Sequence, residues 1–253
     1  MIIRNCLVLL TLCALPLALA CGGGEAPKTE TAAAPAAAAA GATGTASITG
    51  KISFEGTAPA PEKVKLNADP KCAAMHKEGL ERWQVHVKDG GLADVLVYVK
   101  SGIGGSYPVP SEPVLLDQKG CDYWPHMVTM RAGQPLKIRN SDDTLHNIHP
   151  RPTVNPEFNI GQPRQGMESN KNFDKPEIMI PVGCDVHPWM RAYISVLAHP
   201  FYAVTKEDGT FAIQGLPAGD YEIEANHGKL KSQAQKITVK DGEAAKLNFT
   251  FKG

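Results

Sequence analysis

The chain has 253 residues, and its 26 Lys and Arg side chains are balanced by 26 Asp and Glu, which gives a formal net charge of zero. Strongly basic chains attract polyanions, so this balance gives no reason to expect a nucleic-acid partner. With 24 glycines and 20 prolines, the composition favours short strands joined by turns over long helices, and the length allows one or two compact domains.

Residues 1–20 predict a signal peptide. Arg4 supplies the positive end, residues 7–19 form an apolar core, and Ala18-Leu19-Ala20 is a small-residue cleavage site. Cleavage there leaves Cys21 first, which resembles a bacterial lipoprotein, although such proteins usually carry Leu where Ala18 stands. The same bond also suits an ordinary signal peptidase. We expect an exported, periplasmic or cell-surface protein. If it is processed as a lipoprotein, lipid on Cys21 holds it to the membrane.

Residues 21–46 are rich in Gly, Ala and Pro, a composition that cannot bury a core. It predicts a flexible linker, and behind a lipidated Cys21 such a linker would tether a folded module to a membrane surface. The alternative is a disordered tail without that role.

The elements expected after the linker are mostly strands. Apolar residues alternate over residues 47–54. Asp69 and the proline that follows it predict one short helix near residues 70–78, with Asp69 as its cap. Further strands are expected at 83–87 and 93–99, and the second is continuously apolar, as a strand buried on both faces would be.

The middle of the chain continues this β pattern. Short apolar segments predict strands at 114–116, 128–130, 136–139, 178–180 and 193–197. Residues 150–175 are rich in Pro, Gly and Asn and predict an irregular connection, longer than most, of a kind that is often functional or disordered.

The last part of the chain has closely spaced strands and turns. Segments 203–205 and 210–213 flank Lys206-Glu207-Asp208-Gly209, which predicts a hairpin turn with Asp-Gly at its centre. Further strands are expected at 221–225, 237–239 and 247–251. The whole pattern predicts an all-β protein with one short helix.

A group of metal-binding residue types is the strongest functional signal. Cys184, His187 and Met190 lie in one short loop, and His146 lies upstream at the end of an expected strand. In a blue-copper site a Cys and two His surround copper, and a Met binds it weakly from one side. Pro188 stiffens the loop. Taken singly, each ligand residue has a structural interpretation instead, as a buried thiol, part of a turn, a core filler or a loop cap.

Two motifs resemble the cupredoxin family. Cys-x2-His-x2-Met at residues 184–190, with Pro188 after the His, resembles the short loop of the amicyanin-like branch of that family. Residues 145–149 match its upstream His-Asn-x-His motif. The resemblance covers roughly residues 111–198 and implies a Greek-key β-sandwich.

The cupredoxin resemblance implies one type 1 copper site. The ligands that it implies are His146, Cys184, His187 and Met190. It gives Asn147 and Pro188 supporting roles outside the ligand set, with the Asn147 side chain holding the two ligand loops together. His149, the second His of the upstream motif, is not expected to bind the metal.

Cys72 and Cys121 remain once the signal segment, Cys21 and Cys184 are assigned. In an exported chain this even number predicts a disulfide between them. The alternative is a second metal site formed by Cys72, His76, Cys121 and His126, although Cys-x3-His alone is a weak metal signal.

Another pair of segments resembles a carboxypeptidase regulatory-like domain, which is a transthyretin-like (prealbumin-like) β-sandwich. Residues 205–211 and 215–221 match its second half, and residues 48–56 match its opening strand. In that family the domain is usually structural or adhesive, so we assign it no chemistry.

The order of these segments predicts an insertion. Residues 111–198 would form the cupredoxin domain, placed within a second sandwich that is formed by residues 47–110 and 199–253. Two consecutive sandwiches are the alternative arrangement.

The expected function is that of an exported one-electron carrier that cycles between Cu(I) and Cu(II) with a redox partner protein. A copper storage or delivery protein is one alternative, and a surface β-sandwich binding module with a vestigial copper fold is another. We expect no enzyme, because a copper oxidase needs further copper sites with more paired histidines. No small-molecule substrate is evident.

Overall fold

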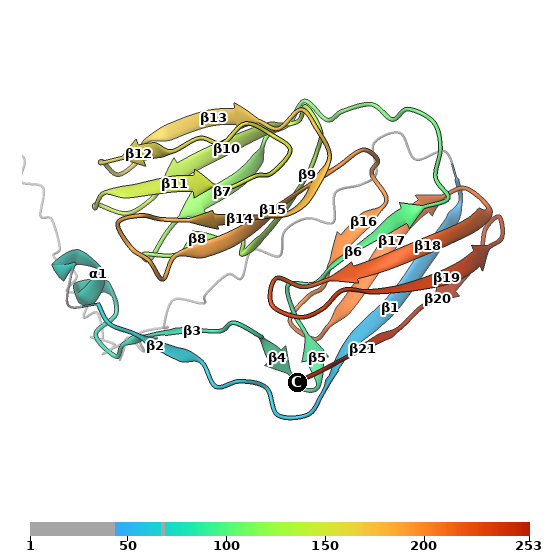
Figure 1. Cartoon of the computed structure of the whole chain (residues 1–253), viewed down its shortest axis with the longest axis horizontal. Coiled ribbons are helices and arrows are strands. Elements are labelled where there is room, and N and C mark those ends of the chain that lie inside the picture. The colour runs from blue at the N-terminus through green and yellow to red at the C-terminus, as the bar shows by residue number, and fades with distance from the viewer. Residues whose placement is uncertain (1–43, 67–68) are drawn as a thin grey trace, which may run out of the picture. The chain divides into compact units, whose positions relative to one another are not determined.

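The structure is a computed structural model that describes residues 44–66 and 69–253. The predicted signal peptide (1–20), the lipid site at Cys21 and the linker as far as residue 43 lie outside the described residues. The described part forms 21 strands and one short helix (Figure 1), which confirms the all-β class. No helix in it is long and apolar enough to cross a bilayer.

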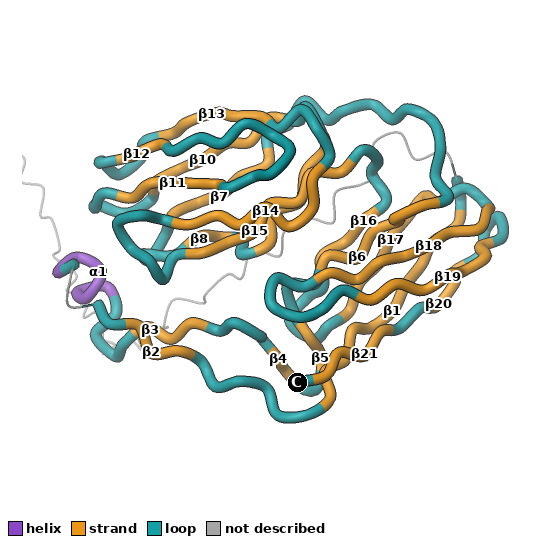
Figure 2. Tube along the Cα trace, in the orientation of Figure 1, coloured by secondary structure: helices purple, strands orange, loops and turns teal. Residues whose placement is uncertain are grey.

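Two sheets take their strands from the two ends of the described chain, and we call this pair the split sandwich (Figure 2). The first sheet contains β1 (Ala46–Glu55), β4 (Val87–Lys88), β5 (Gly91–Leu92), β17 (Thr210–Leu216), β20 (Ala244–Lys246) and β21 (Phe249–Lys252). The second contains β6 (Leu96–Ser101), β16 (Tyr202–Val204), β18 (Gly219–Asn226) and β19 (Gln233–Val239). β1 pairs antiparallel with β17 and parallel with β20 and β21, so the first strand joins the last ones.

The core of the split sandwich follows the alternation of its strands. In β1, Ile48 and Ile52 are fully buried and Phe54 nearly so. Gly50 lies where β1 passes from pairing with β20 to pairing with β21. A Cβ atom on Gly50 would lie 1.7 Å from the carbonyl oxygen of Leu247, so glycine is needed for this close approach.

The other two large sheets come from the middle of the sequence, and we call them the middle sandwich. One contains β7 (Val114–Gln118), β8 (Tyr123–Trp124), β10 (Pro135–Asn140) and β13 (Glu168–Asn172). The other contains β9 (Met127–Arg131), β11 (His146–Pro150), β12 (Ile160–Gln162), β14 (Glu177–Gly183) and β15 (Arg191–Leu197). The segment that was predicted to be irregular, 150–175, therefore contributes one short strand to each sheet.

Strand β10 shows how the middle sandwich leads into the candidate site. Its residues alternate between buried and half-buried, with Leu136 and Ile138 in the core. The last inward residue is Asn140, whose side-chain NH₂ donates to the carbonyl oxygens of Thr144 and Gln162, at 2.8 Å each. These bonds shape the loop that follows β10 and delivers the next strand, β11.

A short segment outside both sandwiches carries the helix. β2 (Glu62–Val64) pairs antiparallel with β3 (Leu80–Arg82), and α1 (Pro70–Met75) lies between them in sequence. Asp69 caps α1 by accepting hydrogen bonds from the backbone N–H groups of Lys71 and Cys72. The helix ends at Met75, before the predicted end at residue 78, because His76 leaves the helical backbone conformation with φ −121° and ψ 63°. The strand predicted at 83–87 is wrong, since of these residues only Val87 lies in a strand.

The hairpin predicted around Asp208-Gly209 is also wrong. The turn itself forms, with the Lys206 N–H donating to the Thr210 carbonyl at 3.0 Å. However, β16 pairs with β6 in one sheet and β17 pairs with β1 in the other. The turn therefore crosses from sheet to sheet. Asp-Gly favours a tight turn, but burial of the flanking strands decides which neighbours they pair with.

Candidate metal centre

The proposed ligands come from two neighbouring segments of the middle sandwich. His146 is the first residue of β11, and β11 pairs with β14 through His149 opposite Gly183. Cys184 follows β14 directly, and the next turn contains His187. Met190 closes this turn, because its N–H donates to the His187 carbonyl at 2.9 Å and its own carbonyl accepts from the Cys184 N–H at 3.3 Å.

The structure brings the nitrogen and sulfur donors together. Nδ1 of His146 lies 3.0 Å from Nδ1 of His187, and Nδ1 of His187 lies 3.8 Å from the Cys184 sulfur. The ligand atoms of these three residues all lie within 4.8 Å of one another. His146 and His187 are 0% and 1% exposed, and Cys184 is 4% exposed, so the group is closed to bulk water.

Each imidazole is held on its outer side by a carboxylate. Nε2 of His146 lies 2.9 Å from Asp142, and Nε2 of His187 lies 2.8 Å from Asp69. A carboxylate accepts a hydrogen bond, so each Nε2 carries a proton, and Nδ1 is the ring nitrogen that faces the other donor atoms.

This arrangement fits a cation. When neither Nδ1 carries a proton, the two lone pairs face each other at 3.0 Å and repel, and a cation between them turns this repulsion into attraction. Two imidazole nitrogens and a thiolate are the donor set of a blue-copper site. His146, His187 and Cys184 would therefore hold copper.

The thiol of Cys184 is prepared for metal binding. Burial alone raises its pKa, but without a metal the hydrogen bonds that His146 and His187 donate to the thiolate outweigh burial and lower the pKa to about 6. The backbone N–H of His187 also points to the sulfur, at 3.4 Å. The thiolate, which is the form that binds metal, therefore dominates at neutral pH.

Asn147 links the two ligand segments. Its side-chain oxygen accepts from the N–H groups of Asp185 and Val186, at 2.7 and 3.4 Å, and lies 3.2 Å from the Cys184 sulfur. Its NH₂ group donates to Asp185 and to Asn159. The cupredoxin resemblance implies a linking role of this kind for Asn147.

The remaining predicted residues lie around this group. Met190 is fully buried in the same apolar cluster as Cys184, and its role as fourth ligand stays a prediction, as does the stiffening role of Pro188. His149 contacts surface carboxylates instead, with Nδ1 at 3.0 Å from Asp185 and Nε2 close to Glu157. That position agrees with leaving His149 out of the ligand set.

Cys72 and Cys121 are joined by a disulfide that ties α1 to the turn before β8. Their sulfurs bond to each other, so the alternative of a second metal site at these residues is wrong. The histidines of that alternative also lie elsewhere: His76 bonds to the Gly120 carbonyl at 2.7 Å, and His126 lies 3.0 Å from Asp122.

Sequence reasoning missed both carboxylates that hold the histidines. Asp142 lies four residues before His146, and its side chain also accepts from the N–H groups of Gly120 and Cys121, at 2.8 Å each. The cluster Asn-Ser-Asp-Asp before His146 was the available signal for it. Asp69 was identified only as a helix cap, and no local pattern connects it with His187, which is 118 residues away.

Comparison with known proteins gives partial similarities. The family described as carboxypeptidase regulatory-like domain matches residues 187–252. This range contains β16–β21 of the split sandwich and also β15 of the middle sandwich, and it leaves out β1, β4, β5 and β6. No curated protein is similar to this chain in sequence.

Several solved structures resemble parts of this chain. A copper-containing nitrite reductase from Thermus scotoductus is 19% identical with a TM-score of 0.30, over 38% of this chain and 25% of its own. A purple cupredoxin from Nitrosopumilus maritimus is 18% identical with a TM-score of 0.29, over 33% and 98%. A Cu(I) form of an amicyanin mutant is 17% identical with a TM-score of 0.31, over 40% and 98%. The chain thus spans about a quarter of the nitrite reductase chain.

Proposed function

We propose that this chain is a one-electron carrier with a single type 1 copper site, held by His146, Cys184 and His187 with Met190 as the weak fourth ligand. Bound copper would supply the Cu(I)/Cu(II) couple. The single observation that carries the proposal is the pair of carboxylate-bound imidazoles whose Nδ1 atoms face each other at 3.0 Å beside the Cys184 sulfur.

The protein's own residues supply a fixed and closed setting for such a couple. Asp142 and Asp69 orient the two rings, and Asn147 holds the Cys184 loop against β11. The ligands are buried, so a change of charge there causes little rearrangement of water. Rigid ligands of this kind suit electron transfer, in which both charge states share one geometry.

Copper storage or delivery is the second candidate function. A protein that hands over copper needs ligands that an incoming acceptor can reach, whereas His146 and His187 are almost completely buried. This burial favours an electron carrier over a copper storage or delivery protein. We propose no catalytic residue for this chain, and we propose that its function is not enzymatic.

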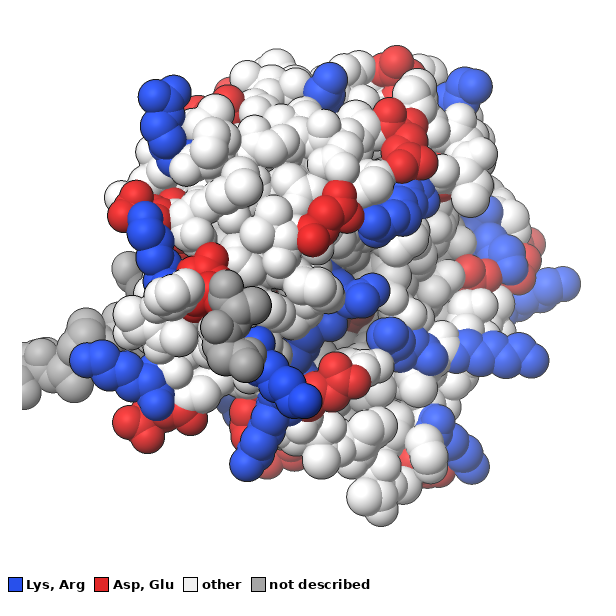
Figure 3. Space-filling model, turned by 60° about the vertical axis from the view of Figure 1, so that its left-hand side comes forward, with Lys and Arg blue, Asp and Glu red and all other residues white. Residues whose placement is uncertain are grey.

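The proposed partner is a redox protein that meets the molecule outside the cytoplasm, with the membrane reached through lipid on Cys21. On the face shown in Figure 3, basic and acidic side chains are interspersed. Docking on that face would therefore depend mainly on local contacts and not on one large electrostatic field of a single sign. The association rate would vary weakly with salt concentration.

A visible spectrum tests the proposal. The purified protein should develop intense blue absorption when Cu(II) is added, and Cys184→Ser should abolish it because the thiolate is lost. His149→Gln is the matched control, since His149 lies beside the site but contacts Asp185 and Glu157, and its spectrum should match that of the parent. A colourless parent would contradict the proposal. Rapid electron self-exchange would separate the carrier from a storage protein, which would exchange slowly.

A further inference from the structure

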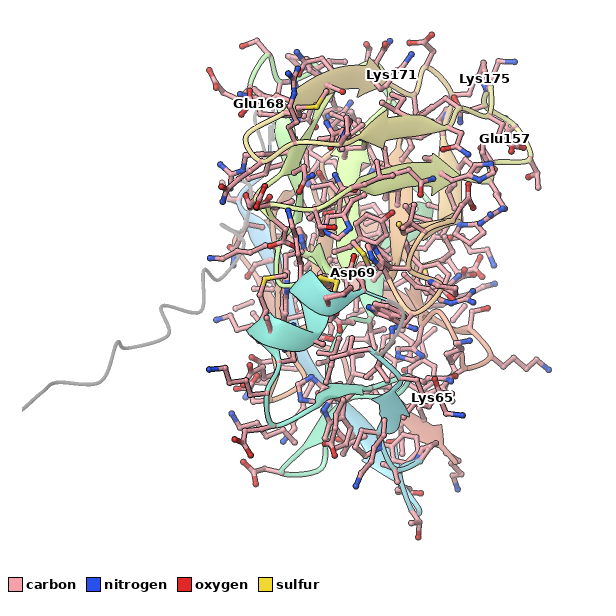
Figure 4. All side chains as sticks on the ribbon, turned by 90° about the vertical axis from the view of Figure 1, so that its left-hand side faces the viewer. Lys65, Asp69, Glu157, Glu168, Lys171 and Lys175 are labelled. Carbon is pink, nitrogen blue, oxygen red and sulfur yellow. A yellow bond between two sulfur atoms is a disulfide. The ribbon has the colours of Figure 1, made fainter. Side chains whose placement is uncertain are left out.

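The segment Asp69–His76, which we call the α1 cap, lies against the metal centre. The disulfide joins Cys72 to Cys121, and the cap's last residue, His76, bonds to the Gly120 carbonyl at 2.7 Å. On the exposed side, Lys71 forms an ion pair of 2.9 Å with Asp143. Figure 4 shows Asp69 at the start of α1, close to the strands of the middle sandwich.

Asp69 uses its two carboxylate oxygens for different tasks. Oδ1 accepts from the N–H groups of Lys71 and Cys72, at 2.8 and 3.1 Å, and so caps the helix. Oδ2 accepts from Nε2 of His187 at 2.8 Å and from the Thr144 hydroxyl at 3.0 Å. One side chain thus couples the position of α1 to the orientation of a proposed copper ligand.

The cap also closes the outer edge of His187. The Cys72 sulfur lies 3.7 Å from Nε2 of His187, and the Trp189 ring packs on the imidazole with centroids 5.0 Å apart. Together with Asp69, these contacts leave His187 1% exposed. Asp69 and Cys72 belong to the α1 cap, so the position of the α1 cap decides whether solvent reaches this edge of the site.

The cap cannot hold this position by itself. α1 has six residues, which is far below the length at which an isolated helix is stable in water. A small apolar cluster that contains Leu66, Cys72 and Cys121 packs beneath it, with Leu80 and Trp189 against it. The disulfide and this cluster are therefore what keep Asp69 within reach of His187.

We propose that Asp69 is a positioning residue for the copper site and that the Cys72–Cys121 disulfide anchors it there. The carboxylate keeps the proton of His187 on Nε2 and turns Nδ1 toward Cys184 and His146. It also places a negative charge beside the ligand, which favours the more highly charged Cu(II) and lowers the reduction potential. This inference rests on the proposed function, because it takes copper as the metal.

Three single substitutions separate positioning from simple helix capping. Asp69→Ser keeps a good helix cap, but the shorter side chain no longer reaches His187. Asp69→Asn removes the charge and has one oxygen where Asp69 has two, so when that oxygen caps the helix its NH₂ group faces Nε2 of His187 and cannot accept a hydrogen bond there. Lys71→Ala is the matched control, since it removes a contact of the same cap that does not involve His187.

The first measurement needs no copper. Nitrogen chemical shifts of His187 in the metal-free protein distinguish a proton on Nε2 from one on Nδ1. We expect the Nε2 form in the parent and in Lys71→Ala, and a mixture of both forms in Asp69→Ser and in Asp69→Asn, since neither variant offers His187 an acceptor while it caps the helix. The same mixture in all four proteins, or none in Asp69→Ser, would overturn the positioning role.

The second measurement uses the copper-loaded protein. We expect both Asp69→Ser and Asp69→Asn to weaken copper binding by about 10-fold to 100-fold and to raise the reduction potential. If the copper affinity and the reduction potential of both Asp69 variants equal those of Lys71→Ala, Asp69 acts only as a helix cap. If the parent shows no blue absorption that depends on Cys184, the proposed function fails, whereas the copper-free measurement still decides whether Asp69 orients His187.

Replacing both cysteines tests the anchor. A folded Cys72→Ser/Cys121→Ser variant should shift the His187 nitrogen signals and the reduction potential in the same direction as Asp69→Ser. Values equal to those of the parent would overturn the anchoring role of the disulfide. If this variant fails to fold, the Asp69 variants, which keep the disulfide, still decide the positioning role.

Discussion

The two sandwiches bury very different side chains. Buried polar and charged residues in the split sandwich are few: Thr205, Glu224 and His227. The middle sandwich buries many more, among them Gln118, Asn140, Asp142, His146, Asn147, Gln162 and His187. A buried polar group costs stability unless it is hydrogen-bonded, and most of these groups support the ligand loops directly or through one neighbour. The difference indicates that the split sandwich is a packed scaffold and the middle sandwich is the part built around a chemical site.

Removing the disulfide should have the largest effect on stability. Cys72→Ala/Cys121→Ala opens a covalent link between residues 49 positions apart, and the free energy of unfolding should fall by about 4 kcal/mol. Urea unfolding of the copper-free protein measures this. A loss below about 1 kcal/mol would mean that the cap contributes little to the middle sandwich.

A core truncation in the split sandwich should separate stability from metal binding. Leu216 is fully buried in the core of the split sandwich, so Leu216→Ala should lower the free energy of unfolding by about 3 kcal/mol and leave copper affinity unchanged. Leu136→Ala, an equal truncation in the middle sandwich, is the comparison. Weaker copper binding in the folded Leu216→Ala protein would contradict the division of the molecule into a scaffold and a site.

Loss of the link between the ligand loops should have a smaller effect on stability. Asn147→Ala leaves the N–H groups of Asp185 and Val186 without their acceptor, and we expect a loss of about 2 kcal/mol. The same change should broaden or shift the blue absorption band, because the Cys184 loop is less firmly held. An unchanged spectrum would show that the loop keeps its shape without Asn147.

The acid sensitivity of the middle sandwich gives the smallest expected effect. Burial would raise the pKa of Glu177, but hydrogen bonds from Thr153 and Asn155 outweigh it and lower the pKa from 4.5 to about 2. Between these values the unfolded chain binds the proton and the folded one does not, so stability falls as the pH falls. The slope from this group is at most about 1.4 kcal/mol per pH unit.

Glu177→Gln tests whether Glu177 causes this loss of stability at low pH, because the amide does not titrate. Urea unfolding of the copper-free protein between pH 5 and pH 2 should show a shallower loss of stability in Glu177→Gln than in the parent. Equal slopes in the two proteins would assign the acid sensitivity to other carboxylates.

The sequence was informative where one short pattern defines the chemistry. Cys184 and His187 lie three residues apart, so their meeting at one point follows from local geometry, and the strand before His146 is visible in the alternation of residues 136–139. Asp69 as a helix cap was also a local prediction. Its second contact, with His187, depends on how a distant segment folds over the site, and no local pattern encodes that contact.

The turn at Asp208-Gly209 shows the same division. Its residues identify a tight turn, but the neighbours of β16 and β17 lie in two different sheets. Which strands pair is decided by where each apolar face is buried, and this depends on the whole chain. For the same reason the parallel pairing of β1 with β20 and β21 could not be expected from the residues around β1.

The position of β1 implies an order of events during synthesis. β5 offers it one early pair, Ser53 with Gly91. Its other partners, β17, β20 and β21, span residues 210–252, so most of the earliest strand stays unpaired until the chain is nearly finished. The middle sandwich is complete once residue 197 has emerged. The metal centre can therefore close first, while the scaffold around it waits for the C-terminal strands to arrive.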